Sequence, residues 1–236
     1  MNVAQVLNGI ALGSLLMILS SGLAMIYGLR GVANFAHGAL YMSGGYVAYT
    51  VANRVSFWLA LVIAPLVLAV VGAALEIMLF RPLRNRSHIE VGLVTFGIAM
   101  IIERVVVLIW GERTLSVNPP PLLSGTTSFL GVDYPSYRLG IILIGALLAI
   151  GLVTWLNRST IGLHIRAASQ DIETASIMGV NVDRLSLVVV CLGAALAGLA
   201  GVLAAPYISL DPGMGGTFLI TVLIIVIIGG IGSVGG

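Results

Sequence analysis

The sequence contains no lysine, a single cysteine and very few charged residues of either sign. Eleven arginines and nine acidic residues make up only 8% of the 236 residues, whereas 59% are hydrophobic. A soluble domain carries about 25% charged residues and covers its surface with them. This chain cannot do so, which indicates that lipid surrounds much of its surface.

The missing lysine excludes several chemistries. A nucleotide-binding P-loop requires the lysine of its GK[ST] sequence, and a Schiff-base enzyme requires a lysine amine. Any ATP hydrolysis that powers this protein must therefore occur in another chain. The single cysteine, Cys191, can form no disulfide within the chain, and a net charge of +2 gives no indication of nucleic-acid binding.

Long uncharged stretches occupy most of the sequence. A spanning helix needs about 20 mainly apolar residues, because the hydrocarbon core of a bilayer is roughly 30 Å thick. Barrel strands are disfavoured, since they alternate in polarity over about ten residues. We therefore predict an all-α, polytopic membrane protein of about seven transmembrane helices, at residues 5–29, 32–53, 56–80, 89–110, 139–156, 185–206 and 214–235.

The placement of arginine sets the expected orientation. The densest basic cluster lies at residues 81–86, which the positive-inside rule makes cytoplasmic. Threading the seven spans from there puts seven arginines inside and three outside, and it makes the N-terminus extracytoplasmic. Two long connections result: residues 111–138 outside the membrane and residues 157–184 in the cytoplasm.

Two predicted spans contain many small or polar residues. Residues 32–53 include Gly38, Gly44 and Gly45, and glycines flank the short apolar part of residues 214–235. Glycine-interrupted spans are typical of broken helices that line a transport pathway. Glycines also permit close packing of intact helices, so both interpretations stay open.

The sixth predicted span repeats small residues at every fourth position. Gly193, Ala197 and Gly201 form one such row, and Ala194 and Gly198 form a second. This pattern lets membrane helices approach each other closely. It predicts packing, either within the chain or against a partner, and indicates no function by itself.

Apart from Glu90 at the very start of a span, three charged side chains fall within predicted spans, where burial is unfavourable and often functional. Glu76 lies about one turn from the basic cluster, so its side chain can snorkel to the inner interface. Glu103 and Arg104 lie deeper, and adjacent residues on a helix face different directions. We expect each of these two to pair with a group on another span; substrate binding is the alternative.

The second predicted span carries polar groups that have no reason to face lipid. Asn34, His37 and Tyr41 are therefore the candidate translocation pathway. His37 is the only histidine inside a span, and local hydrogen bonding or packing is the alternative role for it. The three histidines have no metal-ligand spacing, and no constellation of nucleophile and carboxylates indicates an enzyme.

A short helix is predicted within the cytoplasmic connection, in the segment from Arg166 to Gly179. Asp171 suits its N-cap, Glu173 suits the positive end of the helix dipole, and Gly179 suits the left-handed position after its last turn. Ala175 would share a face with Gly179. An amphipathic helix between two spans suits docking into a groove of another protein; a plain surface connector is the alternative.

Four motifs in order along the chain resemble the permeases of branched-chain amino-acid ABC importers, the LivH type. They are Asn34-Phe35-Ala36-His37-Gly38, Arg81-Pro82-Leu83-Arg84, the segment from Arg166 to Arg184, and Gly229-Gly230-Ile231-Gly232-Ser233. The resemblance implies that the third motif is the ATPase-coupling loop. Members of that family usually continue beyond the fourth motif, so we expect residues 1–236 to be a single permease domain truncated at its C-terminus.

The resemblance also implies partners and a location. The partners would be a second related permease, two ABC ATPase subunits that bind ATP and Mg²⁺, and an extracytoplasmic solute-binding protein, all at a bacterial inner membrane. This chain would itself bind no cofactor. Its solute would be a branched-chain or related amino acid, with urea or a short amide as the alternative. A secondary transporter or channel, a ribose-type sugar permease and a membrane enzyme are the rival functions.

Overall fold

The computed structural model describes residues 3–129 and 131–230 of the protein. The described elements are, in chain order, α1 (Val3–Arg30), α2 (His37–Arg54), α3 (Phe57–Leu75), a π-helical turn η1 (Glu76–Phe80), α4 (His88–Trp110), a 3₁₀ turn η2 (Pro121–Leu123), β1 (Thr126–Phe129), β2 (Val132–Pro135), α5 (Ser136–Arg158), α6 (Thr160–Gln170), α7 (Ile172–Ile177), α8 (Val182–Ala204) and α9 (Met214–Gly229). The chain is thus mostly helical, as predicted.

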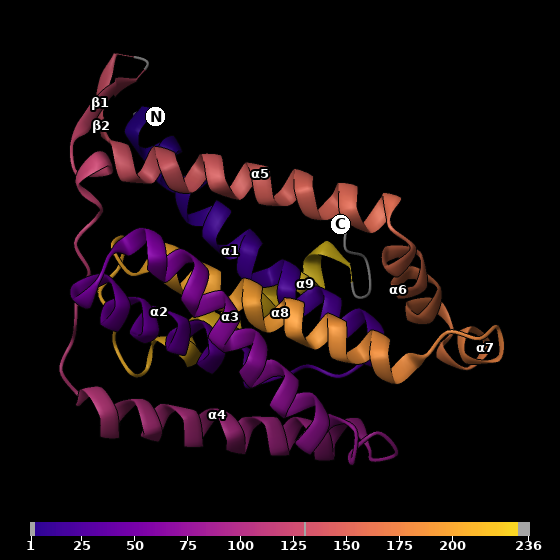
Figure 1. Ribbon diagram of the computed structural model, residues 1–236. Coiled ribbons are helices and arrows are strands. Elements are labelled where there is room, and N and C mark those ends of the chain that lie inside the picture. The colour runs from indigo at the N-terminus through magenta and orange to yellow at the C-terminus, as the bar shows by residue number, and fades with distance from the viewer. Residues whose placement is uncertain (1–2, 130, 231–236) are drawn as a thin grey trace.

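The long helices run between two ends of one bundle (Figure 1). Helices α1, α2, α3, α8 and α9 pack together, while α4 and α5 lie on opposite sides of them (Figure 1). The β1–β2 hairpin and the start of α1 lie at one end, which we call the hairpin end. The turn after η1 lies with α6 and α7 at the other, which we call the arginine-rich end because it holds Arg30 and the cluster at residues 81–86.

Five helices are long and apolar enough to cross a membrane: α1, α3 continued by η1, α4, α5 and α8. Helix α9 is apolar but has only 16 described residues, and α2 is not among the five. Both lie within the bundle beside the other helices (Figure 1). A multi-pass membrane protein is therefore confirmed, whereas the predicted count of seven spans is not.

Helix α2 is more polar than its neighbours because protein surrounds it. It packs against α3, α4, α8 and α9, and ten of its 18 residues are buried. Polar side chains in membrane helices usually face the interior of the bundle, away from lipid. A helix in this position does not need the high hydropathy of a lipid-facing one.

Glycine brings these inner helices into backbone contact. A Cβ added to Gly38 of α2 would lie 2.1 Å from the carbonyl oxygen of Gly215 in α9, and one on Gly44 would lie 2.5 Å from that of Gly198 in α8. The small-residue rows of the sixth predicted span therefore pack within the chain. Helix α2 and the described part of α9 are unbroken. Of the two interpretations, close packing of intact helices therefore holds for residues 37–54 and 214–229, and the broken-helix interpretation does not.

Two other features differ from the sequence-based expectation. The connection at residues 111–138 contains an antiparallel hairpin in which Thr126 pairs with Pro135 and Ser128 pairs with Asp133, so the chain is not purely helical. The second predicted span begins at His37 rather than at residue 32. The chain turns between α1 and α2, where Gly31 adopts a φ of +66° that favours glycine.

Candidate functional site

The short helix α7 occurs where the sequence predicts one. The carboxylate of Asp171 accepts hydrogen bonds of 3.0 Å from the backbone N–H groups of Glu173 and Thr174, so Asp171 is its N-cap. Gly179, with a φ of +92°, follows its C-cap. The N–H of Gly179 bonds to the carbonyl of Ser176, and the next N–H bonds to that of Ala175, which together form a Schellman motif.

Asp171 is ionised in this arrangement. The hydroxyl of Thr174 donates to its carboxylate, and two backbone N–H groups do the same. These hydrogen bonds, that of the Thr174 hydroxyl first, favour the charged form and lower the pKa of Asp171 from its usual value, against the opposing effect of desolvation. At neutral pH the carboxylate of Asp171 is therefore ionised, and its N-cap hydrogen bonds stabilise α7 fully.

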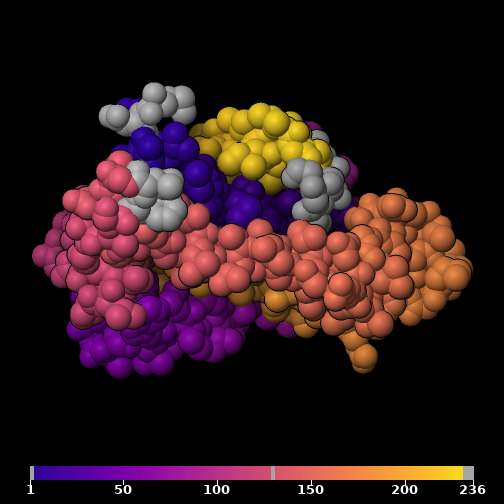
Figure 2. Space-filling model, turned by 90° about the horizontal axis from the view of Figure 1, so that it is seen from above, coloured from indigo at the N-terminus to yellow at the C-terminus, as the bar shows by residue number. Residues whose placement is uncertain are grey.

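Helix α7 presents apolar side chains outward at the edge of the molecule. Ala175 is buried, but Ile177 and Met178 are each 80% exposed and Ile172 is 39% exposed. The helices around residues 160–180 protrude from the bundle (Figure 2). Exposed side chains of this size at a capped, protruding helix are typical of a protein-contact site.

Helix α6 precedes α7 and was not predicted. Ser159 caps it by accepting a hydrogen bond of 2.9 Å from Gly162 N–H. Arg166 folds back to donate to the carbonyl of Leu156, at the end of α5. A cation that caps the last carbonyls of a helix also suits the negative end of its dipole. The structure thus gives Arg166 a local partner, whereas Glu173 is exposed and forms no ion pair within the described residues.

The start of α8 is bound to the turn between η1 and α4. Asn181 caps α8 through the N–H of Arg184. Asp183 then accepts a hydrogen bond of 2.9 Å from Arg84 and forms an ion pair with it. The backbone carbonyl of Asp183 also accepts a long hydrogen bond from Arg81. Because α8 follows α7 after only a few residues, these contacts link α7 to the rest of the arginine-rich end.

A buried network lies directly behind this turn. Arg30, at the end of α1, forms an ion pair with Glu76 of η1 and donates to Ser186 of α8 and to the carbonyl of Phe80. Its guanidinium carbon lies 4.9 Å from the centre of the Phe80 ring. Three helical segments thus meet at one arginine.

The snorkelling prediction for Glu76 is wrong. Its side chain is fully buried, because Arg30 neutralises it inside the bundle. The pairing could have been predicted from the sequence, since the predicted threading already placed Arg30 and Glu76 on the same side of the membrane. Two opposite charges at the same membrane interface favour pairing over separate exposure.

The candidate pathway residues are all buried in the interior. Asn34, His37 and Tyr41 are each at most 1% exposed. The side chain of Asn34 accepts a hydrogen bond from the N–H of Ala36, and His37 Nε2 lies 3.0 Å from the carbonyl oxygen of Leu19 on α1. Within the described residues, Asn34 Nδ2, His37 Nδ1 and the Tyr41 hydroxyl have no hydrogen-bond partner.

Glu103 and Arg104 lie on α4, an outer helix that contacts the bundle mainly through α2. Arg104 is exposed and Glu103 is partly exposed. Neither forms an ion pair with another described residue. The expected partners on other spans are therefore not found among the described residues, and the pairing stays a prediction.

Apolar helices around a polar, glycine-rich interior define this molecule as a multi-pass membrane protein. The chain belongs to the family described as "Branched-chain amino acid transport system / permease component", whose profile matches residues 5–236. It is therefore a transport-system permease component, and the resemblance in its four motifs is confirmed. The last three residues of the fourth motif lie outside the described residues.

Similar proteins carry matching names. The chain is 29% identical to the high-affinity branched-chain amino acid transport system permease protein LivH of Escherichia coli (strain K12), covering 98% of this chain and 80% of that one. It is 27% identical to BraD of Pseudomonas aeruginosa with the same coverage. A probable LivH of Methanocaldococcus jannaschii is 27% identical, covering 94% of this chain and 72% of that one. No solved structure gives a significant match.

Proposed function

We propose that this chain is one of two permease subunits of an ABC-type importer that carries branched-chain amino acids across a bacterial inner membrane. The solute is supported by the names of the similar permeases. ATP and Mg²⁺ bind to two partner ATPase subunits. An extracytoplasmic solute-binding protein delivers the solute at the hairpin end, and the arginine bias supports an extracytoplasmic N-terminus.

The observation that carries this proposal is the capped helix α7 with its exposed apolar side chains. Ile177 and Met178 fit a groove of an ATPase subunit, and Glu173 and Arg166 flank the contact. The motion of the ATPase pair reaches α8 through the short connection at residues 178–181. The ion pair between Arg84 and Asp183 carries it onward to η1 and α4.

The solute path runs through the interior near α2 in this proposal. Asn34, His37 and Tyr41 supply polar groups there whose remaining hydrogen-bonding atoms are unpaired. The path opens when α2 separates from α8 and α9, whose closest contacts are made by glycine backbone, while Tyr41 of α2 also packs on Phe218 of α9 with a ring-centroid distance of 5.0 Å. The glycine contacts have no long side chains to disentangle, which suits an alternating-access change.

The test uses the chain reconstituted in proteoliposomes with its partner permease, ATPases and binding protein. Ile177→Glu places a charge in the proposed contact, where burial without a partner costs several kcal/mol. We expect at least a tenfold loss of ATPase co-purification and of ATP-driven leucine uptake. Retention of both by Ile177→Glu contradicts the coupling assignment.

The matched control is Leu122→Glu in η2, where the replaced side chain is also 80% exposed. It lies in the connection that contains the hairpin, so ATPase co-purification stays unchanged. Uptake of urea or a short amide in place of leucine contradicts the solute but leaves the α7 assignment standing. Uptake that continues with the ATPases omitted indicates a secondary transporter or channel instead.

A further inference from the structure

A cavity of about 350 Å³ opens at the arginine-rich end. It lies between the turn after η1, the end of α1, the start of α8 and the start of α7. Its charged and polar lining residues are Arg30, Arg81, Arg84, Asn85, Arg86, His88, Asp183 and Ser186. The proposed transport mechanism uses the ion pair between two of these residues, Arg84 and Asp183, but assigns no ligand to this basic cavity, as we call it.

The basic cavity has an excess of positive charge. Four arginines line it against one lining carboxylate, Asp183, and one buried carboxylate behind it, Glu76, so two positive charges stay uncompensated. Arg86 is exposed and pairs with no acidic side chain among the described residues. The buried Nε of Arg81 lies 3.9 Å from the carboxylate of Glu76, which is an ion-pair distance, but it donates no hydrogen bond within those residues. The cavity therefore suits an anionic group that accepts several hydrogen bonds.

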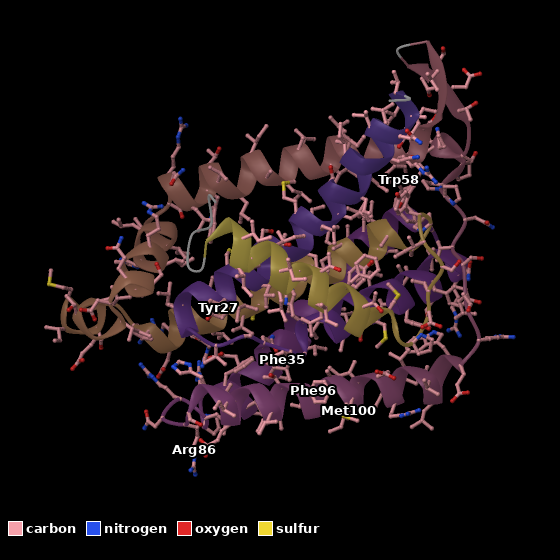
Figure 3. All side chains as sticks on the ribbon, turned by 180° about the vertical axis from the view of Figure 1, so that it is seen from behind. Tyr27, Phe35, Trp58, Arg86, Phe96 and Met100 are labelled. Carbon is pink, nitrogen blue, oxygen red and sulfur yellow. The ribbon has the colours of Figure 1, made fainter. Side chains whose placement is uncertain are left out.

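An apolar groove of about 460 Å³ adjoins it. The groove runs between α4 and the segment that joins α1 to α2, and it shares Val32 and His88 with the basic cavity. Figure 3 shows Tyr27, Phe35 and Phe96 along this gap, with Arg86 at its arginine-rich end. The remaining lining is glycine and aliphatic, with Leu93 on α4.

We propose that these two cavities form one site for an anionic phospholipid. The phosphate binds in the basic cavity, at Arg86 and Arg81, and an acyl chain lies in the groove. From His88 to Phe96 the groove extends along α4 for about 12 Å, against roughly 15 Å for the hydrocarbon of one leaflet. Basic pockets between membrane helices at the cytoplasmic surface bind anionic lipid headgroups. The adjoining apolar groove then accommodates the acyl chain of the same lipid.

The combination of the two cavities distinguishes this occupant from others. An acidic segment of a partner protein would use the basic cavity but not a groove that faces the hydrocarbon. A zwitterionic lipid would use the groove but would leave two positive charges uncompensated. The site does not depend on the identity of the proposed solute, and its lipid contacts at Arg86 and in the groove are not part of the proposed coupling path.

Native mass spectrometry of the purified chain, titrated with dioleoyl-phosphatidylglycerol, tests the proposal. We expect specific binding of this lipid and much weaker binding of dioleoyl-phosphatidylcholine. Arg86→Gln should weaken phosphatidylglycerol binding about fivefold, since one arginine near an anionic headgroup contributes about 1 kcal/mol. Leu93→Trp fills the groove and should also reduce binding. Both side chains are exposed, so neither change disturbs folding.

Matched controls separate this site from general attraction. Arg158→Gln removes an exposed arginine from the end of α5, and Leu108→Trp alters a lipid-facing position at the far end of α4. Neither should change phosphatidylglycerol binding. Equal binding of phosphatidylcholine, or an equal loss in Arg158→Gln, overturns the proposal. Binding that is insensitive to Leu93→Trp but displaced by millimolar inorganic phosphate or by an acidic peptide also overturns it, since the groove is then not occupied.

Discussion

The inner layer of this protein (α1, α2, α3, α8 and α9) and its outer layer (α4 and α5) contain helices of similar hydropathy in different surroundings. Helices α8, α5 and α4 have mean hydropathies of 2.6, 2.5 and 2.2, yet 61% of the most apolar part of α8 is buried, against 17% for α5 and α4. Hydropathy thus identifies a helix that enters the membrane but does not indicate whether lipid or protein surrounds it. Small residues and paired charges indicate which helices are surrounded by protein. The predictions below test whether substitutions of the same type have different effects in the two layers.

The largest expected effect is at the buried ion pair between Arg30 and Glu76. Glu76→Ala leaves Arg30, which is only 16% exposed, without its carboxylate, and we expect a loss of about 3 kcal/mol in unfolding free energy. Thermal or denaturant unfolding in detergent measures it. A loss below about 1 kcal/mol would show that water reaches Arg30 and that the pair is not part of the inner layer.

Two further variants isolate the role of charge at this pair. The double change Arg30→Met with Glu76→Met should recover most of the lost stability, because an apolar pair of similar volume avoids desolvation of both charges. On the outer helix, Glu103→Ala should leave the stability of the isolated chain nearly unchanged. A large loss there would show that α4 packs more tightly than its exposure indicates.

Glycine-to-alanine substitutions should change the free energy of unfolding in opposite directions in the two layers. In Gly38→Ala the new Cβ would lie 2.1 Å from a backbone oxygen of α9 that no rotamer change can move, so we expect a loss of about 2–3 kcal/mol. In Gly97→Ala on α4 the new Cβ meets nothing within 4 Å, and the better helix propensity of alanine should give a gain of up to about 1 kcal/mol. Unfolding of both variants under one condition measures the two changes in free energy. If both variants are stabilised, or both destabilised, the expected difference between the two layers is contradicted.

A smaller effect is expected where an outer helix contacts an inner one. The hydroxyl of Tyr137, on α5, donates a buried hydrogen bond of 2.8 Å to the carbonyl of Leu203 on α8. Tyr137→Phe leaves that carbonyl without this donor, and we expect a loss of about 1 kcal/mol. Tyr49→Phe on α2, which removes a hydroxyl that makes no such contact with a described residue, is the control. Equal effects of the two changes would show that the hydrogen bond does not fasten α5 to the inner layer.

Much of the fold could be predicted because single residues determine local geometry. The ends of α7 follow from Asp171 and Gly179, whose side-chain or backbone preferences act within a few positions. The ends of the lipid-facing helices follow from the runs of apolar residues. Glycine in α2 was ambiguous, since a broken helix and a close contact need the same residue. Only the position of Gly215 opposite Gly38 decides between them.

The candidate site was less predictable because its contacts are distant in sequence. Arg30 and Glu76 are 46 positions apart, and Arg84 and Asp183 are 99 positions apart. Charge pattern indicates that such groups lie at one end of the membrane but not which pairs form. The roles of Asn34, His37 and Tyr41 stay predictions, because burial suits both a closed path and a packed core.

The smallest expected effect is in α7, which belongs to neither layer and depends on local hydrogen bonds. The pKa of Asp171 is lowered on folding, so its cap stabilises α7 above the pKa of the unfolded chain, which has the usual value of 3.8. That stabilisation is lost as the pH falls through the still lower folded pKa. Amide hydrogen exchange at Glu173 and Thr174 should therefore be constant, after correction for intrinsic rates, from pH 7 to about pH 5 and should lose protection below the unfolded value. Asp171→Asn keeps an N-cap without a titrating group and should remove the pH dependence while retaining protection. If the variant shows the same acid sensitivity as the wild type, the change originates in the bundle, and α7 depends on the inner layer for its structure.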